Sequence, residues 1–179
     1  SSKPNPLDEV KSLIFYLDIL YRNVYDDLIS DPDIMKGSSN FNITFGSWVG
    51  ADKDGNPYVT TKVTKEALKI YSNQIISIYK EKIIELSDDF SVSTNFVDCP
   101  NRLQRRIKNY SILLNKEFDH YSKINFDEPF RIFLSLVFHR LENFQLNNKG
   151  YKSFHEFLED MEIFQNSVNE VFGNNFRIS

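Results

Sequence analysis

Residues 45–60 read FGSWVGADKDGNPYVT, and this stretch decides how the rest of the chain is interpreted. Three of the six glycines in the chain fall within it. Gly55, Asn56 and Pro57 favour a turn, because Gly and Asn tolerate positive φ and Pro fixes its own φ. Loops that follow a strand often hold functional groups, since the strand positions them. We therefore predict that residues 46–57 form a functional loop.

The five residues that lead into this loop alternate in polarity. Phe41, Ile43 and Phe45 are apolar, whereas Asn42 and Thr44 between them are polar. A period of two is typical of a strand with one buried face. The sequence therefore predicts a short strand that runs directly into the loop.

Helical periodicity dominates the rest of the chain. Apolar residues recur at spacings of three and four in five stretches, which predicts helices at about 7–28, 64–86, 100–114, 128–145 and 153–172. Thr64 is the expected N-cap of the second helix. Ser153 and Glu156 form a capping box at the start of the fifth, and Gly173 is its expected stop. Residues 115–126 are ambiguous. We therefore predict a mainly α fold class with one or two short strands, and we expect residues 1–179 to form one domain or a fragment of a larger one.

Composition excludes several classes of protein. The chain has 179 residues and a net charge of −4, which gives no support for nucleic-acid binding. A single cysteine, Cys99, excludes an internal disulfide framework and fits a reducing compartment, so a cytoplasmic location is expected. No apolar run approaches the ~20 residues of a membrane span, so no membrane partner is expected.

Two ligand-binding motifs can be tested against the loop, and both fail. Asp52, Asp54 and Gly55 superficially suggest an EF-hand, which needs Gly at position six and Glu at position twelve. Counted from Asp52, Gly55 falls at position four and Val63 at position twelve, where valine has no side-chain oxygen. A phosphate-binding P-loop also fails, because the Gly-Lys-Ser/Thr sequence is missing.

Residues 45–60 strongly resemble the segment F-G-S-W-M-G-G-D-R-D-G-N-P-x-V-T of phosphoenolpyruvate carboxylases. Further similar stretches follow the family order: PLDEV at 6–10, VT at 63–64, EPFR at 128–131 with RL at 140–141, and YKSFHEFLE at 151–159 followed by FQNSV at 164–168. The resemblance therefore covers nearly the whole chain. It implies a slice of the family's α/β barrel with extra helices.

The resemblance also implies an activity and its limits. The family converts phosphoenolpyruvate and bicarbonate to oxaloacetate and phosphate with Mg²⁺ or Mn²⁺, and the parent enzyme is expected to be a homo-oligomer. Family members are several times longer than this chain. Their essential histidine lies in an H-P-T-E motif upstream, and their metal-binding acids and F-H-G-R-G-G loop lie downstream. None of these motifs occurs here, so no catalytic residue and no metal ligand is expected in this chain.

The resemblance implies that this chain contributes one wall of an active site. Trp48 would line the apolar pocket beside the methylene group of phosphoenolpyruvate. The substrate-binding loop would comprise Trp48, Gly50, Asp52, Lys53, Asp54, Gly55 and Asn56. Two positions depart from the family: Lys53 replaces an Arg and cannot form its bidentate fork, and Ala51 replaces a Gly, which restricts the backbone.

Structural interpretations of the same residues stay open. Trp48 is an apolar side chain that could belong to the core. Asp52 and Asp54 could cap the turn through bonds to the backbone. The basic cluster Arg102, Arg105, Arg106 and Lys108 is read as a solvated helix face rather than a site for an anionic effector.

Two hypotheses about the whole chain remain. The first is a fragment that carries the active-site loop, packs against the rest of the parent chain and is inactive alone. The second is a degenerate helical interaction module, which the departures at Lys53 and Ala51 favour. The coding sequence on either side of these residues would discriminate the two.

Overall fold

The computed structural model describes residues 5–25, 27–28, 46–51 and 56–173. The chain divides into two compact units, residues 1–75 with Ser179 and residues 76–178, which we describe separately. The boundary lies within one long helix. The strand predicted at 41–45 falls outside the described residues, as do the loop residues 52–55.

The first unit begins with helix α1 (Pro6–Leu20). Asn5 is its N-cap, since its Oδ1 accepts a hydrogen bond from Leu7 N at 3.1 Å. A π-helical segment, η1 (Tyr21–Tyr25), follows directly. The periodicity predicts a helix to residue 28 without indicating this change, because the apolar spacing continues through it.

The long helix α4 spans Thr61–Asp89, so the expected N-cap at Thr64 is wrong. The cap is Thr60, whose Oγ1 accepts from Val63 N at 3.3 Å. Thr64 lies inside the first turn, and its N–H already donates to the Thr60 carbonyl at 2.9 Å. Two threonines four residues apart offer the same cap, and the sequence does not distinguish them.

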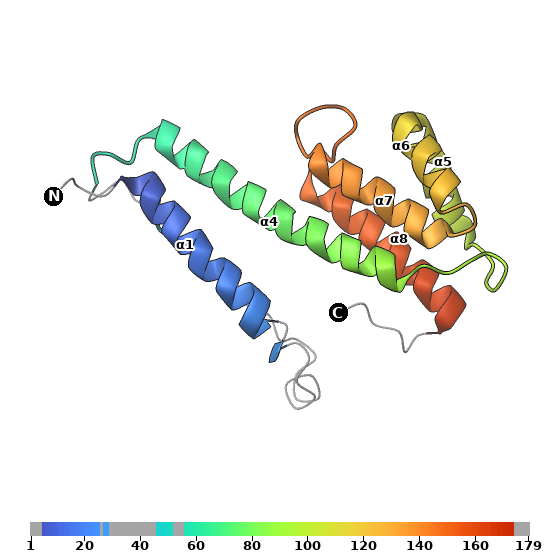
Figure 1. The fold of residues 1–179 in the computed structure, drawn as a ribbon. Coiled ribbons are helices and arrows are strands. Elements are labelled where there is room, and N and C mark those ends of the chain that lie inside the picture. The colour runs from blue at the N-terminus through green and yellow to red at the C-terminus, as the bar shows by residue number, and fades with distance from the viewer. Residues whose placement is uncertain (1–4, 26, 29–45, 52–55, 174–179) are drawn as a thin grey trace. The chain divides into compact units, whose positions relative to one another are not determined.

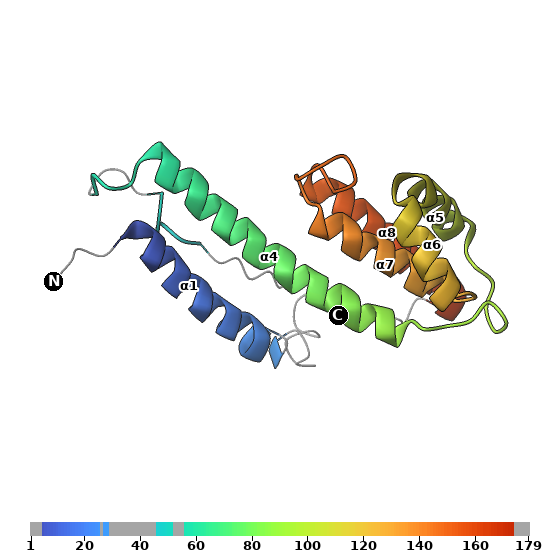
Figure 2. The same ribbon diagram turned by 45° about the horizontal axis from the view of Figure 1, so that its top comes forward.

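In the first unit, α1 lies alongside the N-terminal half of α4, as both views show (Figures 1 and 2). Val10 of α1 is fully buried. Further along, Gln74 Nε2 of α4 donates to Asp18 Oδ1 of α1 at 2.9 Å. This hydrogen bond joins the two helices toward the C-terminal end of α1.

The second unit combines the C-terminal half of α4 with four helices: α5 (Asn101–Leu113), α6 (Asn115–Ile124), α7 (Pro129–Glu142) and α8 (Phe154–Phe172). Most of α7 is buried, and its Phe133 and Phe130 pack against Phe164 of α8 with ring centroids 6.3 and 5.9 Å apart. The helix α6 resolves the ambiguous stretch at 115–126.

The ends of α8 confirm their prediction. Ser153 is the N-cap and its Oγ accepts from Glu156 N at 3.4 Å, while Glu156 Oε2 accepts from Lys152 N at 3.1 Å. Gly173 is the C-cap with φ +89°. Ser153 thus satisfies one N–H group of the first turn, while Glu156 reaches back to the N–H of the residue before the cap.

The mainly α fold class is confirmed. Regular structure in the described residues is helical, with no strand among them. None of these helices combines the length and apolar character needed to cross a bilayer.

Candidate functional site

The structure describes the predicted loop on either side of residues 52–55, so Asp52, Lys53, Asp54 and Gly55 lie outside the described residues. Its first part, residues 46–51, contains a tight turn in which Ala51 N donates to the Trp48 carbonyl at 3.0 Å. The Trp48 side chain is 82 % exposed. The interpretation of Trp48 as a core residue is therefore wrong within the described chain.

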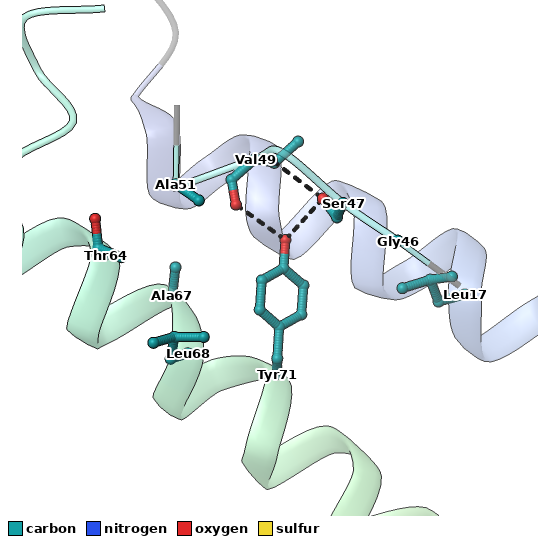
Figure 3. A pocket seen from close by; sticks show the side chains of 10 residues that line it. Leu17, Gly46, Ser47, Val49, Ala51, Thr64, Ala67, Leu68 and Tyr71 are labelled. Carbon is teal, nitrogen blue, oxygen red and sulfur yellow. Dashed lines mark hydrogen bonds between the residues drawn. The ribbon is translucent and has the colours of Figure 1, made fainter. Parts of the chain in front are cut away.

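The turn is attached to α4 through the hydroxyl of Tyr71 (Figure 3). This hydroxyl lies 3.2 Å from Ser47 Oγ and donates to the Val49 carbonyl, also at 3.2 Å. Ser47 Oγ in turn accepts from Val49 N at 3.1 Å. These bonds hold the Ser47 side chain before Trp48 and the Val49 backbone after it.

Gly50 provides the second attachment. It is buried, has φ +81°, and a Cβ at this position would lie 2.7 Å from Ala67 Cβ and 3.3 Å from Val10 Cγ2. Both the conformation and the close approach exclude a larger residue. The adjacent Ala51 is exposed, and Gln145 is the one described non-glycine residue with positive φ. Alanine in place of the family's second glycine is therefore tolerated in this turn.

A cavity of about 280 Å³ lies between the turn, α1 and α4. Its lining is mostly apolar and includes Leu17, Val49, Ala67, Leu68 and Tyr71 (Figure 3). Trp48 is not among the lining residues. The turn thus covers an apolar cavity on one side while its tryptophan faces solvent.

The second part of the loop returns the chain to α4. Asn56 Oδ1 accepts from Tyr58 N at 3.0 Å, and the Asn56 carbonyl accepts from Val59 N, also at 3.0 Å. Asn56 is half-buried and Val59 is buried. Asn56 therefore stabilises this turn through its side-chain and backbone oxygens.

The residues in the described ranges do not fit a metal ion. No group of three or more His, Cys, Asp or Glu side chains among them is placed to hold one. We therefore derive no chemical step that passes through a metal in this chain.

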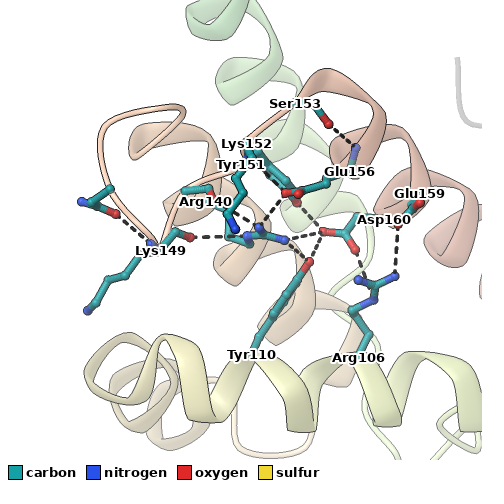
Figure 4. Close-up of polar contacts among 12 residues, drawn as sticks. Arg106, Tyr110, Arg140, Lys149, Tyr151, Lys152, Ser153, Glu156, Glu159 and Asp160 are labelled. Atoms are coloured by element: carbon teal, nitrogen blue, oxygen red, sulfur yellow. Dashed lines mark hydrogen bonds and ion pairs between the residues drawn. The ribbon is translucent and has the colours of Figure 1, made fainter.

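The second unit contains a buried polar cluster that the sequence did not indicate (Figure 4). We call Arg106, Tyr110, Arg140, Tyr151, Glu156 and Asp160 the Arg140 cluster. Arg140 Nη1 donates to the Tyr110 hydroxyl at 2.6 Å, and Nη2 donates to Glu156 Oε2 at 3.1 Å and the Gly150 carbonyl at 3.2 Å. The guanidinium carbon also lies 4.0 Å from the ring centroid of Tyr151.

Asp160 is the anion of this cluster and is fully buried. The hydroxyls of Tyr110 and Tyr151 both donate to its Oδ2. Arg106 Nε lies 3.4 Å from Oδ1, an ion-pair distance, although Oδ1 accepts no hydrogen bond from the described residues. Burial raises the pKa of Asp160 despite these donors and cations. Burial and the neighbouring carboxylate likewise raise the pKa values of both tyrosines.

The cluster corrects one interpretation of the basic stretch on α5. Arg102, Arg105 and Lys108 are exposed, as a solvated face requires. Arg106 is half-buried and pairs with Asp160. The periodicity alone did not identify it, because its partner lies about fifty residues away on α8.

Comparison with known proteins returns one family. A family model described as phosphoenolpyruvate carboxylase matches residues 1–175. The phosphoenolpyruvate carboxylase of a Nostoc species is 27 % identical over 191 aligned residues, covering 94 % of this chain and 19 % of the relative. That of a Synechococcus species is 30 % identical and covers 82 % of this chain and 16 % of the relative. The chain thus spans about a fifth of the length of the curated relatives it matches.

Proposed function

The chain belongs to the phosphoenolpyruvate carboxylase family, and from this premise we propose that it forms part of an enzyme that converts phosphoenolpyruvate and bicarbonate to oxaloacetate and phosphate. Residues 46–57 form one wall of the active site. The essential histidine and the ligands of Mg²⁺ or Mn²⁺ belong to parts of the enzyme outside these 179 residues. The enzyme is a homo-oligomer of the cytoplasm.

The observation that supports the proposal is that Trp48 is exposed on a turn held by hydrogen bonds. Trp48 is 82 % exposed, yet both of its neighbours are bonded to the Tyr71 hydroxyl, Ser47 through its side chain and Val49 through its carbonyl. An exposed aromatic on a fixed turn provides a rigid apolar surface for a ligand. In the proposed enzyme this surface contacts the methylene group of phosphoenolpyruvate.

Lys53 supplies the charge in this proposal. Phosphoenolpyruvate carries a carboxylate and a phosphate, and its enolate gains negative charge during the reaction, which fixed cations stabilise. Lysine acts on such groups as a point charge and does not form the two parallel bonds that arginine forms. We therefore expect weaker substrate binding than in a relative with arginine at this position.

Substrate binding by the chain can be measured through Trp48, which is the chain's single tryptophan. Phosphoenolpyruvate is expected to change its fluorescence saturably, and Lys53→Met is expected to weaken that response. Lys62→Met, which removes an exposed lysine outside the loop, is the matched control. The absence of a saturable response in the wild-type chain would contradict the proposed substrate loop.

Catalysis by the chain is a separate measurement. We expect no oxaloacetate from phosphoenolpyruvate and bicarbonate with Mg²⁺, because the resemblance places the histidine and metal motifs elsewhere. Robust turnover by this chain alone would overturn the inactive-fragment hypothesis. The alternative, a degenerate interaction module, is favoured by Lys53 in place of arginine. It predicts that phosphoenolpyruvate does not bind and that the surrounding coding sequence lacks the two missing motifs.

A further inference from the structure

Tyr71 is the one described side chain of α4 with hydrogen bonds to the turn that carries Trp48 (Figure 3). Its hydroxyl bonds Ser47 on one side of the tryptophan and Val49 on the other, at 3.2 Å each. Tyr71 lies within the helix that the apolar spacing predicts at about 64–86. In the structure its ring lines the apolar cavity, and its hydroxyl bonds the turn.

The hydroxyl lies beside a part of the turn that makes few other contacts with the helices. Gly46, Ser47 and Trp48 are exposed, and Gly50 is the residue of the turn that packs closely against α1 and α4. Between Gly46 and Gly50 the backbone passes over an apolar cavity. Without the hydroxyl, neither Ser47 nor Val49 would have a polar contact to the helix among the described residues.

We propose that Tyr71 is a positioning residue of the substrate loop: its hydroxyl bonds the Ser47 side chain before Trp48 and the Val49 carbonyl after it, and thereby sets the direction of the indole. The inference rests on the proposed function for its consequence, substrate binding. Its structural part is independent of that function. The Tyr71 ring also forms part of the cavity wall, so removal of the hydroxyl alone leaves the apolar packing in place.

Tyr71→Phe removes the hydroxyl and keeps the ring. We expect the fluorescence anisotropy of Trp48 to fall and its quenching by acrylamide to rise, with the far-ultraviolet circular dichroism unchanged. Tyr16→Phe is the matched control, because Tyr16 is 63 % exposed on α1 and its ring contact with Phe15 survives the change. Ser47→Ala removes the other end of one bond at an exposed position and is expected to act in the same direction.

A Trp48 anisotropy in both Tyr71→Phe and Ser47→Ala equal to that of the wild type would overturn the positioning role. For substrate binding, Tyr71→Phe is expected to raise the Kd for phosphoenolpyruvate about threefold to tenfold, the usual range for one lost hydrogen bond. A changed anisotropy with an unchanged Kd would overturn the link to substrate. A wild-type chain that does not bind phosphoenolpyruvate would instead overturn the proposed function, and the anisotropy would still decide whether Tyr71 positions Trp48.

Discussion

The turn of residues 46–51, which carries Trp48, and the Arg140 cluster both contain residues on which the family resemblance rests, yet these residues have opposite surroundings in the two regions. In the turn, the motif residue with the largest apolar side chain faces solvent. In the cluster, Arg140, Tyr151 and Glu156 are bonded to one another or to the same neighbours (Figure 4). Similarity to a family therefore marks two kinds of residue, those bonded within the fold and those whose side chains remain exposed.

The largest effect should come from the centre of the cluster. Arg140→Met is expected to lower the free energy of unfolding by about 3–5 kcal/mol, because it removes a buried guanidinium that bonds Tyr110 and Glu156 and pairs with Asp160 at 4.0 Å. Denaturant unfolding followed by circular dichroism measures this. Arg131→Met on the same helix is the control. Its ion pairs with Glu128 and Asp88 are partly exposed, so we expect a loss of at most about 1 kcal/mol. Equal losses in the two variants would refute the special role of Arg140.

The corresponding change in the turn is Gly50→Ala. The new Cβ meets Ala67 Cβ at 2.7 Å in a left-handed backbone, so strain and overpacking together should cost about 2–4 kcal/mol. The loss should appear with a shift in Trp48 emission, because the turn must move to relieve the contact. Gly46→Ala is the control, since nothing lies within 4 Å of its added Cβ. A stable Gly50→Ala variant with unchanged emission would show that the turn does not depend on this contact.

The helical fold could be predicted from the sequence, because apolar spacing and capping residues determine where most of the helices lie. The capping box at Ser153 and the stop at Gly173 depend on adjacent residues and were confirmed. The Arg140 cluster was not predicted, since its bonds join α5, α7 and α8 and have no local pattern. The sequence predicts a helix around Tyr71 but not the bonds of its hydroxyl, because these join it to residues more than twenty positions earlier.

The next effect concerns the charge of Asp160. Burial raises its pKa in the folded protein above the ordinary value of 3.8, so between these two pKa values the folded state binds more protons than the unfolded state. The contribution of Asp160 to stability is therefore complete below 3.8 and is lost as the pH rises through the raised pKa. Asp160→Asn lacks this dependence and should cost about 1–3 kcal/mol through its altered hydrogen bonds.

The test is the difference in the free energy of unfolding between the wild type and Asp160→Asn, measured from about pH 4 to about pH 7. This difference should decrease as the pH rises. Glu159→Gln, which changes an exposed neighbour that also lies near Arg106, is the control. A difference that increases with pH would mean that the two arginines outweigh burial and hold the pKa of Asp160 down.

The smallest effect is expected from the loss of a helix N-cap, which can be compared beside each of the two regions. Thr60→Ala removes the cap of α4 beside the loop, and Ser153→Ala removes the cap of α8 beside the cluster. Each should cost about 1 kcal/mol in unfolding experiments, because a cap satisfies one N–H group whatever lies around it. Glu156 connects the second cap to the cluster, since its N–H donates to Ser153 and its carboxylate accepts from Arg140. A distinctly larger loss of unfolding free energy for Ser153→Ala would therefore show that the Arg140 cluster also stabilises the start of α8. Equal losses would show that the cap of α8 acts independently of the cluster, so that the two regions differ only in how their side chains are packed.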